Sequence, residues 1–434
     1  MSTWPQARPQ AYRLLLVCAF LAILAWIIGG FLSVKDIQTL RAAVILSLLT
    51  TVSLAVFWYA SRGDPAGRTL FILLLVSFGL KLFAAYFRFA TSLLADAFVY
   101  DTVGERIAAE LSRGTWSGLT GVTGTEFVQT LTGLVYFLTG VSLYGITILW
   151  AWFGLLGMLF FYKAFTTAFP QGDRRLYLIL ILLYPSMLLW TSSLGKDALV
   201  VFFLGMATYG AARLYRRIEL SGALWLAVGV AGMLMIRPHI TGVFVVSFGA
   251  LVLLRPIRAG LMTPVIRLTG LILFALVAGA LIRTAASFVA LESLSAENVG
   301  EFMQVQQERT TQGGSAFQQV NPWTPLGYAV AVPTVLFRPF PWEANNVFAL
   351  IAATEGLGLL ALIVFRARSV WSALRNVRRD GCLLMTLVYA LLFIFFFSAI
   401  ANFGIIARQR VQLFPFVFMW IAYLGAADRE RRNR

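Results

Sequence analysis

Long runs of apolar residues, separated by short polar segments, alternate along almost the whole chain. A helix needs about 20 residues to cross the roughly 30 Å hydrocarbon core of a bilayer. Twelve runs approach that length: 11–33, 42–60, 69–93, 144–162, 176–193, 198–213, 220–236, 240–254, 266–290, 346–365, 382–400 and 411–427. Open strands would leave backbone groups unpaired in lipid, so these runs predict helices. We expect an all-α polytopic membrane protein of about 12 transmembrane helices, with residues 1–434 as a single transmembrane domain.

Composition and charge agree with this pattern. Hydrophobic residues make up 59% of the chain and charged residues 12%, which excludes an ordinary soluble protein. The formal net charge of +16 could suggest nucleic acid as a partner. Most basic residues, however, fall in alternate loops that hold few acidic ones, as the positive-inside rule describes for cytoplasmic loops. We therefore expect no nucleic-acid partner, and both termini in the cytoplasm.

The two cysteines, Cys18 and Cys382, both fall inside apolar runs, and the chain has one histidine. These residues give no disulfide framework, no thiolate metal site and no histidine cluster. The cofactor is left unknown, because a divalent metal is compatible with the sequence although no clear ligand cluster stands out.

With this orientation, two long segments face the exterior, 94–143 and 291–345. In the first, apolar residues at 103, 107, 108 and 111 recur at helical spacing, which predicts a helix on the membrane surface that ends near Gly114. The stretch 125–142 is apolar but broken by Thr and Gly, and fits either a re-entrant helix or a second surface helix. The second segment holds a polar loop, 304–321, followed by prolines and aromatics that suggest a lip over a cavity.

The first exterior segment also carries the leading candidate for catalysis. Asp96 directly follows an apolar run and is flanked by apolar residues, a setting in which a carboxylate can act as a general base. Tyr100 and Asp101 follow as supporting polar residues, although Asp101 near a helix start also complements the helix dipole. Glu343, in the second exterior segment, is a further supporting carboxylate.

Basic residues at exterior breaks in the chain run against the positive-inside trend. They are Lys196, Arg237, His239, Arg338, Arg408 and Arg410. They are candidates to bind a phosphate group. Other roles stay open: Lys196 can form an ion pair with Asp197 at a turn, the arginines can extend to lipid head groups, and His239 can be a turn residue. Glu355 lies inside an apolar run, where Lys81 or Arg88 would be its expected partner.

Two stretches resemble a known superfamily. They are Asp96-x-x-x-Tyr100 with the helix ending at Gly114, and Leu-Thr-Gly-Leu-Val-Tyr136-Phe-Leu-Thr-Gly140-Val-Ser. Together they resemble the start of integral-membrane C-type (GT-C) glycosyltransferases. The resemblance implies a polyprenyl-phosphate-linked sugar as donor, an exterior glycan or lipid as acceptor, contact with membrane lipid, and Asp96 as the catalytic base. It also implies a multi-pass protein of the bacterial plasma (inner) membrane. Two alternatives remain: a polymerase like those of O-antigen synthesis, and a polytopic transporter or flippase.

The orientation predicts how single cysteines react in a background without Cys18 and Cys382. Cysteines placed at Ser117 and Gln312 should react with an impermeant thiol reagent on intact cells or spheroplasts, because both lie in predicted exterior segments. A cysteine at Arg375 should stay unlabelled until the membrane is opened. Labelling at position 375 alone would reverse the orientation.

Overall fold

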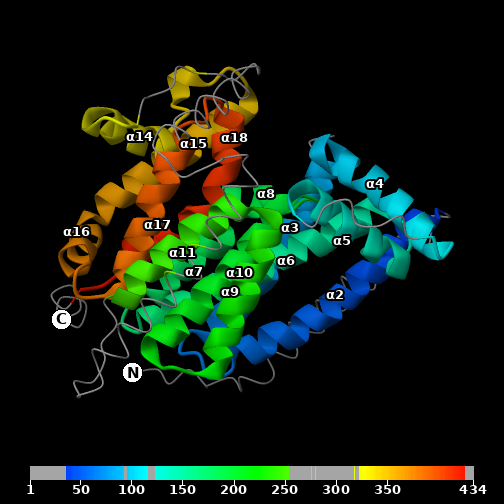
Figure 1. Ribbon diagram of the computed structural model, residues 1–434, viewed down its shortest axis with the longest axis horizontal. Helices are drawn as coiled ribbons and strands as arrows, with labels where there is room; N and C mark the ends of the chain where they lie inside the picture. The colour runs from blue at the N-terminus through cyan, green and yellow to red at the C-terminus, as the bar shows by residue number, and fades with distance from the viewer. Residues whose placement is uncertain are drawn as a thin grey trace, which may run out of the picture. The chain divides into compact units, whose positions relative to one another are not determined.

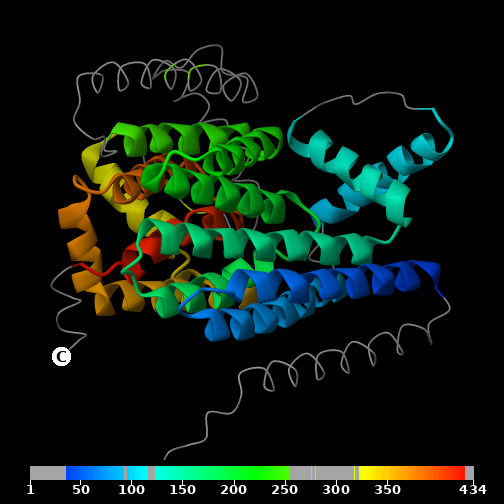
Figure 2. The ribbon, with the colours of Figure 1, turned by 90° about the horizontal axis from the view of Figure 1, so that it is seen from below.

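The computed structural model describes residues 36–91, 95–115, 123–253, 275, 279, 317 and 322–425. Helices form nearly all the regular structure of these residues, as expected for an α-helical membrane protein (Figures 1 and 2). The chain divides into two compact units. Unit 1 comprises residues 1–119, 128–152 and 192–195, and unit 2 comprises residues 120–127, 153–191 and 196–434.

Unit 1 is built around a helical hairpin of α2 (Ile37–Ser61) and α3 (Gly67–Ala90). The side chain of Asp36 accepts a hydrogen bond from the Thr39 N–H and so begins α2. The first part of α6 (Leu143–Ala168) joins the hairpin, where the Trp152 indole donates to the Ser53 hydroxyl at 2.9 Å. Among the described residues of unit 1, α2 and α3 are complete membrane-length apolar helices, and α6 begins there.

The helix predicted to end near Gly114 is present as α4 (Ala95–Ser112), and it packs against α5 (Gly124–Thr139). The helices approach closely at Gly104, where a Cβ atom would lie 2.5 Å from Thr132 Cγ2. Ala108 is buried while Glu105 and Arg113 are exposed, which confirms the expected division of faces. The helix begins five residues earlier than Tyr100, so Asp96 belongs to its first turn.

Unit 2 holds the rest of α6 and the helices that follow. They are α7 (Arg174–Leu183), α8 (Pro185–Trp190), α9 (Lys196–Arg216), α10 (Leu220–Ile236), α11 (Pro238–Leu253), α14 (Pro325–Phe337), η1 (Pro341–Glu343), α15 (Val347–Phe365), α16 (Ala367–Asn376), α17 (Gly381–Phe397), α18 (Phe403–Gln409), η2 (Arg410–Gln412) and α19 (Phe414–Ala422).

Helices α6, α9 and α10 pack backbone against backbone in unit 2. A Cβ atom on Gly205 would lie 2.4 Å from the Gly157 carbonyl oxygen, and one on Gly229 would lie 2.5 Å from the Ala207 nitrogen. Small residues at such crossings let helices approach closely in lipid, where apolar surfaces gain little from contact alone. These contacts make the three helices a closely packed group.

The two ends of α9 lie in different surroundings. Its 21 residues span about 30 Å at the rise of an α-helix. At its start, Asp197 pairs with Arg237, at the break before α11, and with Arg408, in the last turn of α18. At its end, the Tyr215 hydroxyl accepts from the Gly381 N–H at 3.1 Å. The segments that contain Asp197, Arg237 and Arg408 therefore meet at the start of α9.

Five helices among the described residues are long and apolar enough to cross a membrane: α2, α3, α6, α9 and α15. A sixth is reached if α16 and α17, bent by 109° at their junction, count as one span. The run at 176–193 is broken at Pro185 into α7 and α8, because proline lacks the N–H that continues a helix. The run at 411–427 likewise gives only the short helix α19. Runs 11–33 and nearly all of 266–290 lie outside the described residues, so the number of twelve remains a prediction.

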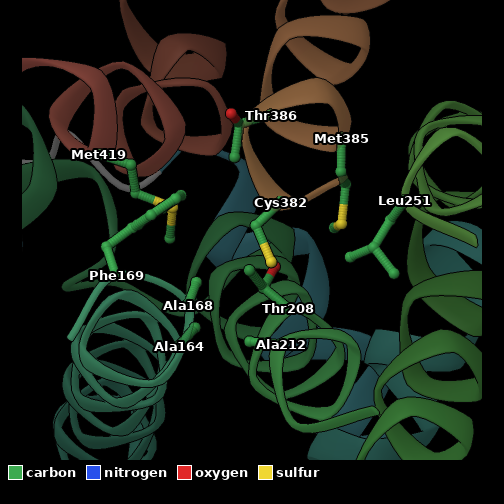
Figure 3. A pocket seen from close by; sticks show the side chains of 10 residues that line it. All are labelled: Ala164, Ala168, Phe169, Thr208, Ala212, Leu251, Cys382, Met385, Thr386 and Met419. Atoms are coloured by element: carbon green, nitrogen blue, oxygen red, sulfur yellow. The ribbon is translucent and has the colours of Figure 1, made fainter. Parts of the chain in front are cut away.

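A small pocket lies among α6, α9, α11, α17 and α19, where Cys382 and Met385 point toward Thr208 and Leu251 (Figure 3). Its volume of about 10 Å³ is at the lower limit for one water molecule. Because its lining is mostly apolar and it is far too small for a sugar or a phosphate, this pocket is a packing feature rather than a substrate site.

Candidate functional site

The predicted acidic residues of unit 1 lie on the first two turns of α4. Asp101 accepts a hydrogen bond from the hydroxyl of Tyr136 on α5. Burial raises the pKa of the Asp101 carboxyl, and the bond from Tyr136 only partly opposes that rise. Tyr100 is buried beside them. Asp96 stands one and a half turns before Asp101 on the same helix, and its backbone position is the part of it that the structure describes.

The predicted basic residues of unit 2 meet around one carboxylate, Asp197. One oxygen, Oδ1, accepts from Arg237 Nη2 at 2.7 Å, and the other, Oδ2, accepts from Arg408 Nε. The side chains of Asp197 and Arg237 are 5% and 7% exposed, whereas that of Arg408 is 27% exposed. We call these three residues with Gln409 and Gln412 the arginine network. It presents one partly exposed guanidinium above a buried ion pair.

Two glutamines extend the arginine network. Gln409 Oε1 accepts from Arg237 Nη1 and from Gln412 Nε2, the latter at 2.8 Å. Gln412 is fully buried, and its own Oε1 is a buried acceptor without a hydrogen-bond donor among the described residues. The last atom of the arginine network, Gln412 Oε1, is therefore a buried acceptor that receives no hydrogen bond from the described residues.

Breaks in the helices place these side chains. Asp197 lies in the first turn of α9, where a carboxylate favours the helix N-terminus. Arg237 is the C-cap of α10 and Pro238 starts α11, so the chain turns at the arginine. Asn402 accepts from the Gly404 and Ile405 N–H groups and begins α18, which carries Arg408 and Gln409. Three separate chain breaks thus supply one site.

Lys196 and His239 lie next to the arginine network. Lys196 precedes Asp197, and His239 follows Pro238 at the start of α11. Both Lys196 and Arg237 lie near enough to His239 for their charges to act on it. The exposed ring of His239 lies 6.4 Å from the ring of Phe397, measured between centroids. This neighbourhood is cationic, with Asp197 at its centre.

Arg410 is the most buried of the predicted basic residues, with 1% of its surface exposed. Its Nη1 donates to the Leu336 carbonyl oxygen at 2.8 Å. Its Nε and Nη2 are buried, and no described residue accepts a hydrogen bond from them. Leaving such groups unsatisfied costs about 1–3 kcal/mol each, and more for a charged group. Arg410 therefore has two buried donors available for an acceptor.

Glu355 lies within electrostatic range of Arg410 but makes its hydrogen bonds elsewhere. Its carboxylate accepts from the Ser186 N–H at 2.7 Å and from the Ser186 hydroxyl, at the start of α8. The expected pairing with Lys81 or Arg88 stays a prediction, because those two residues belong to unit 1 and Glu355 belongs to unit 2. Within unit 1, Lys81 donates to the Ser192 hydroxyl at 3.1 Å. The break at Pro185 exposes the N–H groups that Glu355 binds.

Arg338 and Glu343 neutralise each other. Arg338 donates to both carboxylate oxygens of Glu343, and its guanidinium stacks 4.4 Å from the Phe317 ring and 5.1 Å from the Phe403 ring. Burial raises the pKa of the Glu343 carboxyl. The hydrogen bonds from Arg338 and from the Phe340 N–H lower that pKa by more than burial raises it, so it lies below its usual value. A joint site of Lys196, Arg237 and Arg338 stays a prediction, because Arg338 makes its ion pair outside the arginine network.

Sequence reasoning missed several members of this site. It treated Asp197 as a possible partner of Lys196, and it did not consider Gln409, Gln412 or Ser186. Gln409 could have been predicted from its place between Arg408 and Arg410. A polar residue between two arginines at a helix break lies in the same turn as they do. Among the described residues, no group of three or more His, Cys, Asp or Glu side chains could hold a metal ion.

The shared carboxylate gives a stability prediction. Asp197→Asn keeps the size of the side chain but removes the charge that two guanidiniums share, and we expect a loss of about 3 kcal/mol because one of those pairs is buried. Thermal unfolding of the purified protein in detergent measures this. The matched control is Glu219→Gln: Glu219 pairs with Arg213 at 2.6 Å, but the side chains are 38% and 28% exposed, so the loss should be below about 1 kcal/mol. Equal losses would contradict a special role for Asp197.

Comparison with protein-family models found no match for this chain, and comparisons with curated proteins and with solved structures found none either.

Proposed function

We propose that this protein is a membrane glycosyltransferase that moves a sugar from a polyprenyl-phosphate carrier to a glycan or lipid acceptor. The observation that carries the proposal is the arginine network of unit 2 with Arg410 beside it. Here Asp197 accepts from Arg237 and Arg408, and two buried nitrogens of Arg410, Nε and Nη2, have no acceptor among the described residues. The resemblance of the Asp96 segment to GT-C enzymes supplies the type of reaction.

A phosphate group suits the donors at this site. Guanidinium groups bind phosphate oxygens through paired hydrogen bonds, and such charged bonds are about twice as strong as neutral ones. Four cationic side chains, Lys196, Arg237, Arg408 and Arg410, stand near two carboxylates, Asp197 and Glu355, in this part of unit 2. A bound phosphate would balance part of that surplus charge. It would also accept bonds from Arg410 that the described protein groups do not.

The proposed reaction needs one base and one stabilised leaving group. The acceptor hydroxyl oxygen attacks the anomeric carbon of the sugar, and the bond from that carbon to the phosphate oxygen breaks. The electron pair leaves with the polyprenyl phosphate, and the hydroxyl proton passes to the Asp96 carboxylate. A positioned base contributes about 10² to 10⁴-fold. Arginines aimed at the phosphate stabilise the charge that develops on it.

The proposal also covers the membrane topology and the residues that support the reaction. We infer about 12 spans with the termini in the cytoplasm of a bacterial inner membrane, so that the arginine network faces the exterior. Tyr100, Asp101 and Glu343 act as supporting polar groups, and His239 joins the phosphate site through its position beside Arg237. The polar Tyr136–Asp101 contact supports a structural role for Asp101 within α4 and α5.

The first prediction from this proposal concerns binding of the carrier. Undecaprenyl phosphate, the lipid that remains after transfer, should raise the unfolding temperature of the purified protein, and undecaprenol, which lacks the phosphate, should not. At a lipid concentration of 100 times Kd the stabilisation should reach about 2.7 kcal/mol. Equal effects of both lipids would contradict a phosphate site.

The variant for this binding test is Arg410→Met. It removes two buried donors that no described group satisfies, so the unliganded protein should keep its stability or gain slightly, while the stabilisation by undecaprenyl phosphate should be lost. The matched control is Arg366→Met, which removes another guanidinium that donates to a carbonyl oxygen, that of Ile421. Its buried Nη2 makes no hydrogen bond among the described residues and lies 3.9 Å from Asp173. Arg366→Met should respond to the lipid as the wild type does.

The second prediction concerns the base. Asp96→Asn keeps the size of the side chain but removes its basic oxygen, so sugar transfer in nanodiscs should fall by at least about 10²-fold while undecaprenyl phosphate still binds. Asp101→Asn should matter much less. Turnover is measured as polyprenyl phosphate released from a panel of polyprenyl-phosphate sugars. Near wild-type turnover by folded Asp96→Asn protein would favour the polymerase alternative, in which arginines act without a carboxylate at this position.

A further inference from the structure

Helix α16 differs from the other described helices of unit 2 in carrying a strongly basic surface. The segment 366–379 contains five arginines and no acidic residue. The first acidic residue after it, Asp380, is occupied in accepting bonds from the Cys382 and Leu383 N–H groups at the start of α17. The positive charge of this segment is therefore not balanced from within it.

One side of α16 is anchored to the rest of unit 2. Ser369 and Ala373, one turn apart, are buried, and the helix packs against α19. Arg366, which links α15 to α16, donates to the Ile421 carbonyl oxygen at 3.1 Å and approaches Asp173 at 3.9 Å. This anchoring fixes which residues of α16 point outward.

The outward side combines apolar and basic side chains. Trp371 is 57% exposed and Leu374 is 40% exposed, and the guanidinium of Arg375 lies 5.2 Å from the centroid of the Trp371 ring. Arg368, Arg378 and Arg379 are also exposed. We call Arg368, Trp371, Leu374, Arg375, Arg378 and Arg379 the basic face of α16.

The direction of α16 relative to its neighbours suits a position at a membrane boundary. The apolar helix α15, long enough to cross a bilayer, ends at Phe365 just before α16. The apolar helix α17 follows, and its axis is bent by 109° from that of α16. Figure 1 shows α16 at the end of α17, turned across it. A short helix that lies nearly at right angles to an adjoining apolar helix runs along the interface rather than through the bilayer.

We propose that the basic face of α16 binds the head groups of anionic phospholipids in the membrane that surrounds the protein. Tryptophan favours the depth of the head groups, and Leu374 adds a second apolar contact below them. The arginines flank these two residues and reach phosphodiester groups, whose negative charge complements theirs. No residue of α16 belongs to the arginine network, so this inference is independent of the proposed enzyme activity.

The test counts bound lipids on the full-length protein. Purified protein in detergent is titrated with phosphatidylglycerol or with phosphatidylcholine of the same acyl chains, and native mass spectrometry gives the affinity for each. The wild type should prefer phosphatidylglycerol. In Arg368→Gln/Arg375→Gln that preference should weaken about tenfold, with phosphatidylcholine unchanged, because each surface arginine contributes on the order of a few-fold to anionic lipid binding. The preference should also fall as salt is raised.

A matched control separates position from total charge. Arg175→Gln/Arg217→Gln removes the same two charges from exposed sites on the same predicted membrane face, and should leave the preference within about twofold of the wild type. Unfolding temperatures of both variants should equal that of the wild type, because the substituted side chains are exposed. Equal losses in the two variants, or no loss in either, would overturn the proposal.

Discussion

The end of unit 2 that holds the arginine network depends on one carboxylate. Asp197 receives Arg237 through one oxygen and Arg408 through the other, so a single side chain joins the starts of α9 and α11 to α18. In a low-dielectric interior such a pairing stabilises the fold only while both partners are present, since each ion alone carries a desolvation cost of several kcal/mol. The three chain breaks therefore adopt their positions together, and any function of this end inherits that coupling.

This pairing also explains why Arg410 differs from its neighbours. Arg237 and Arg408 donate to Asp197, and Arg338 donates to Glu343. The carboxylate of Glu355, whose charge acts on Arg410, instead accepts its hydrogen bonds from Ser186 at the start of α8. Two hydrogen-bond donors of Arg410 consequently remain without a described acceptor. Of these four arginines, three are paired with carboxylates among the described residues and Arg410 is not, so the charges around them are arranged asymmetrically. Such an arrangement is favourable when an anion completes the set.

The positions of the helices were easier to predict from the sequence than the partners of the charged side chains. Long apolar runs such as those of α2, α3, α6 and α15 have one physical solution in lipid, so their positions could be placed within a few residues. The placement of basic residues at predicted exterior breaks in the chain likewise identified Arg237 and Arg408. Which carboxylate each arginine meets depends on contacts between residues 40 or 211 positions apart, and periodicity carries no information about them. Glu355 shows the same limit, because its partner is a backbone N–H freed by Pro185 rather than a cation.

The two ends of unit 2 use arginine in opposite ways. At the start of α9 the guanidiniums are mostly buried and paired, so their positions are fixed to within hydrogen-bond distance, as recognition of one ligand requires. Along α16 they are exposed and unopposed by acidic residues of the same segment, which suits a surface of many interchangeable head groups. The positive-inside rule applies to exposed arginines such as those along α16, because it concerns charges outside the apolar spans. An arginine that departs from that rule and is also buried is therefore a stronger indication of a specific binding site than the total charge of the chain.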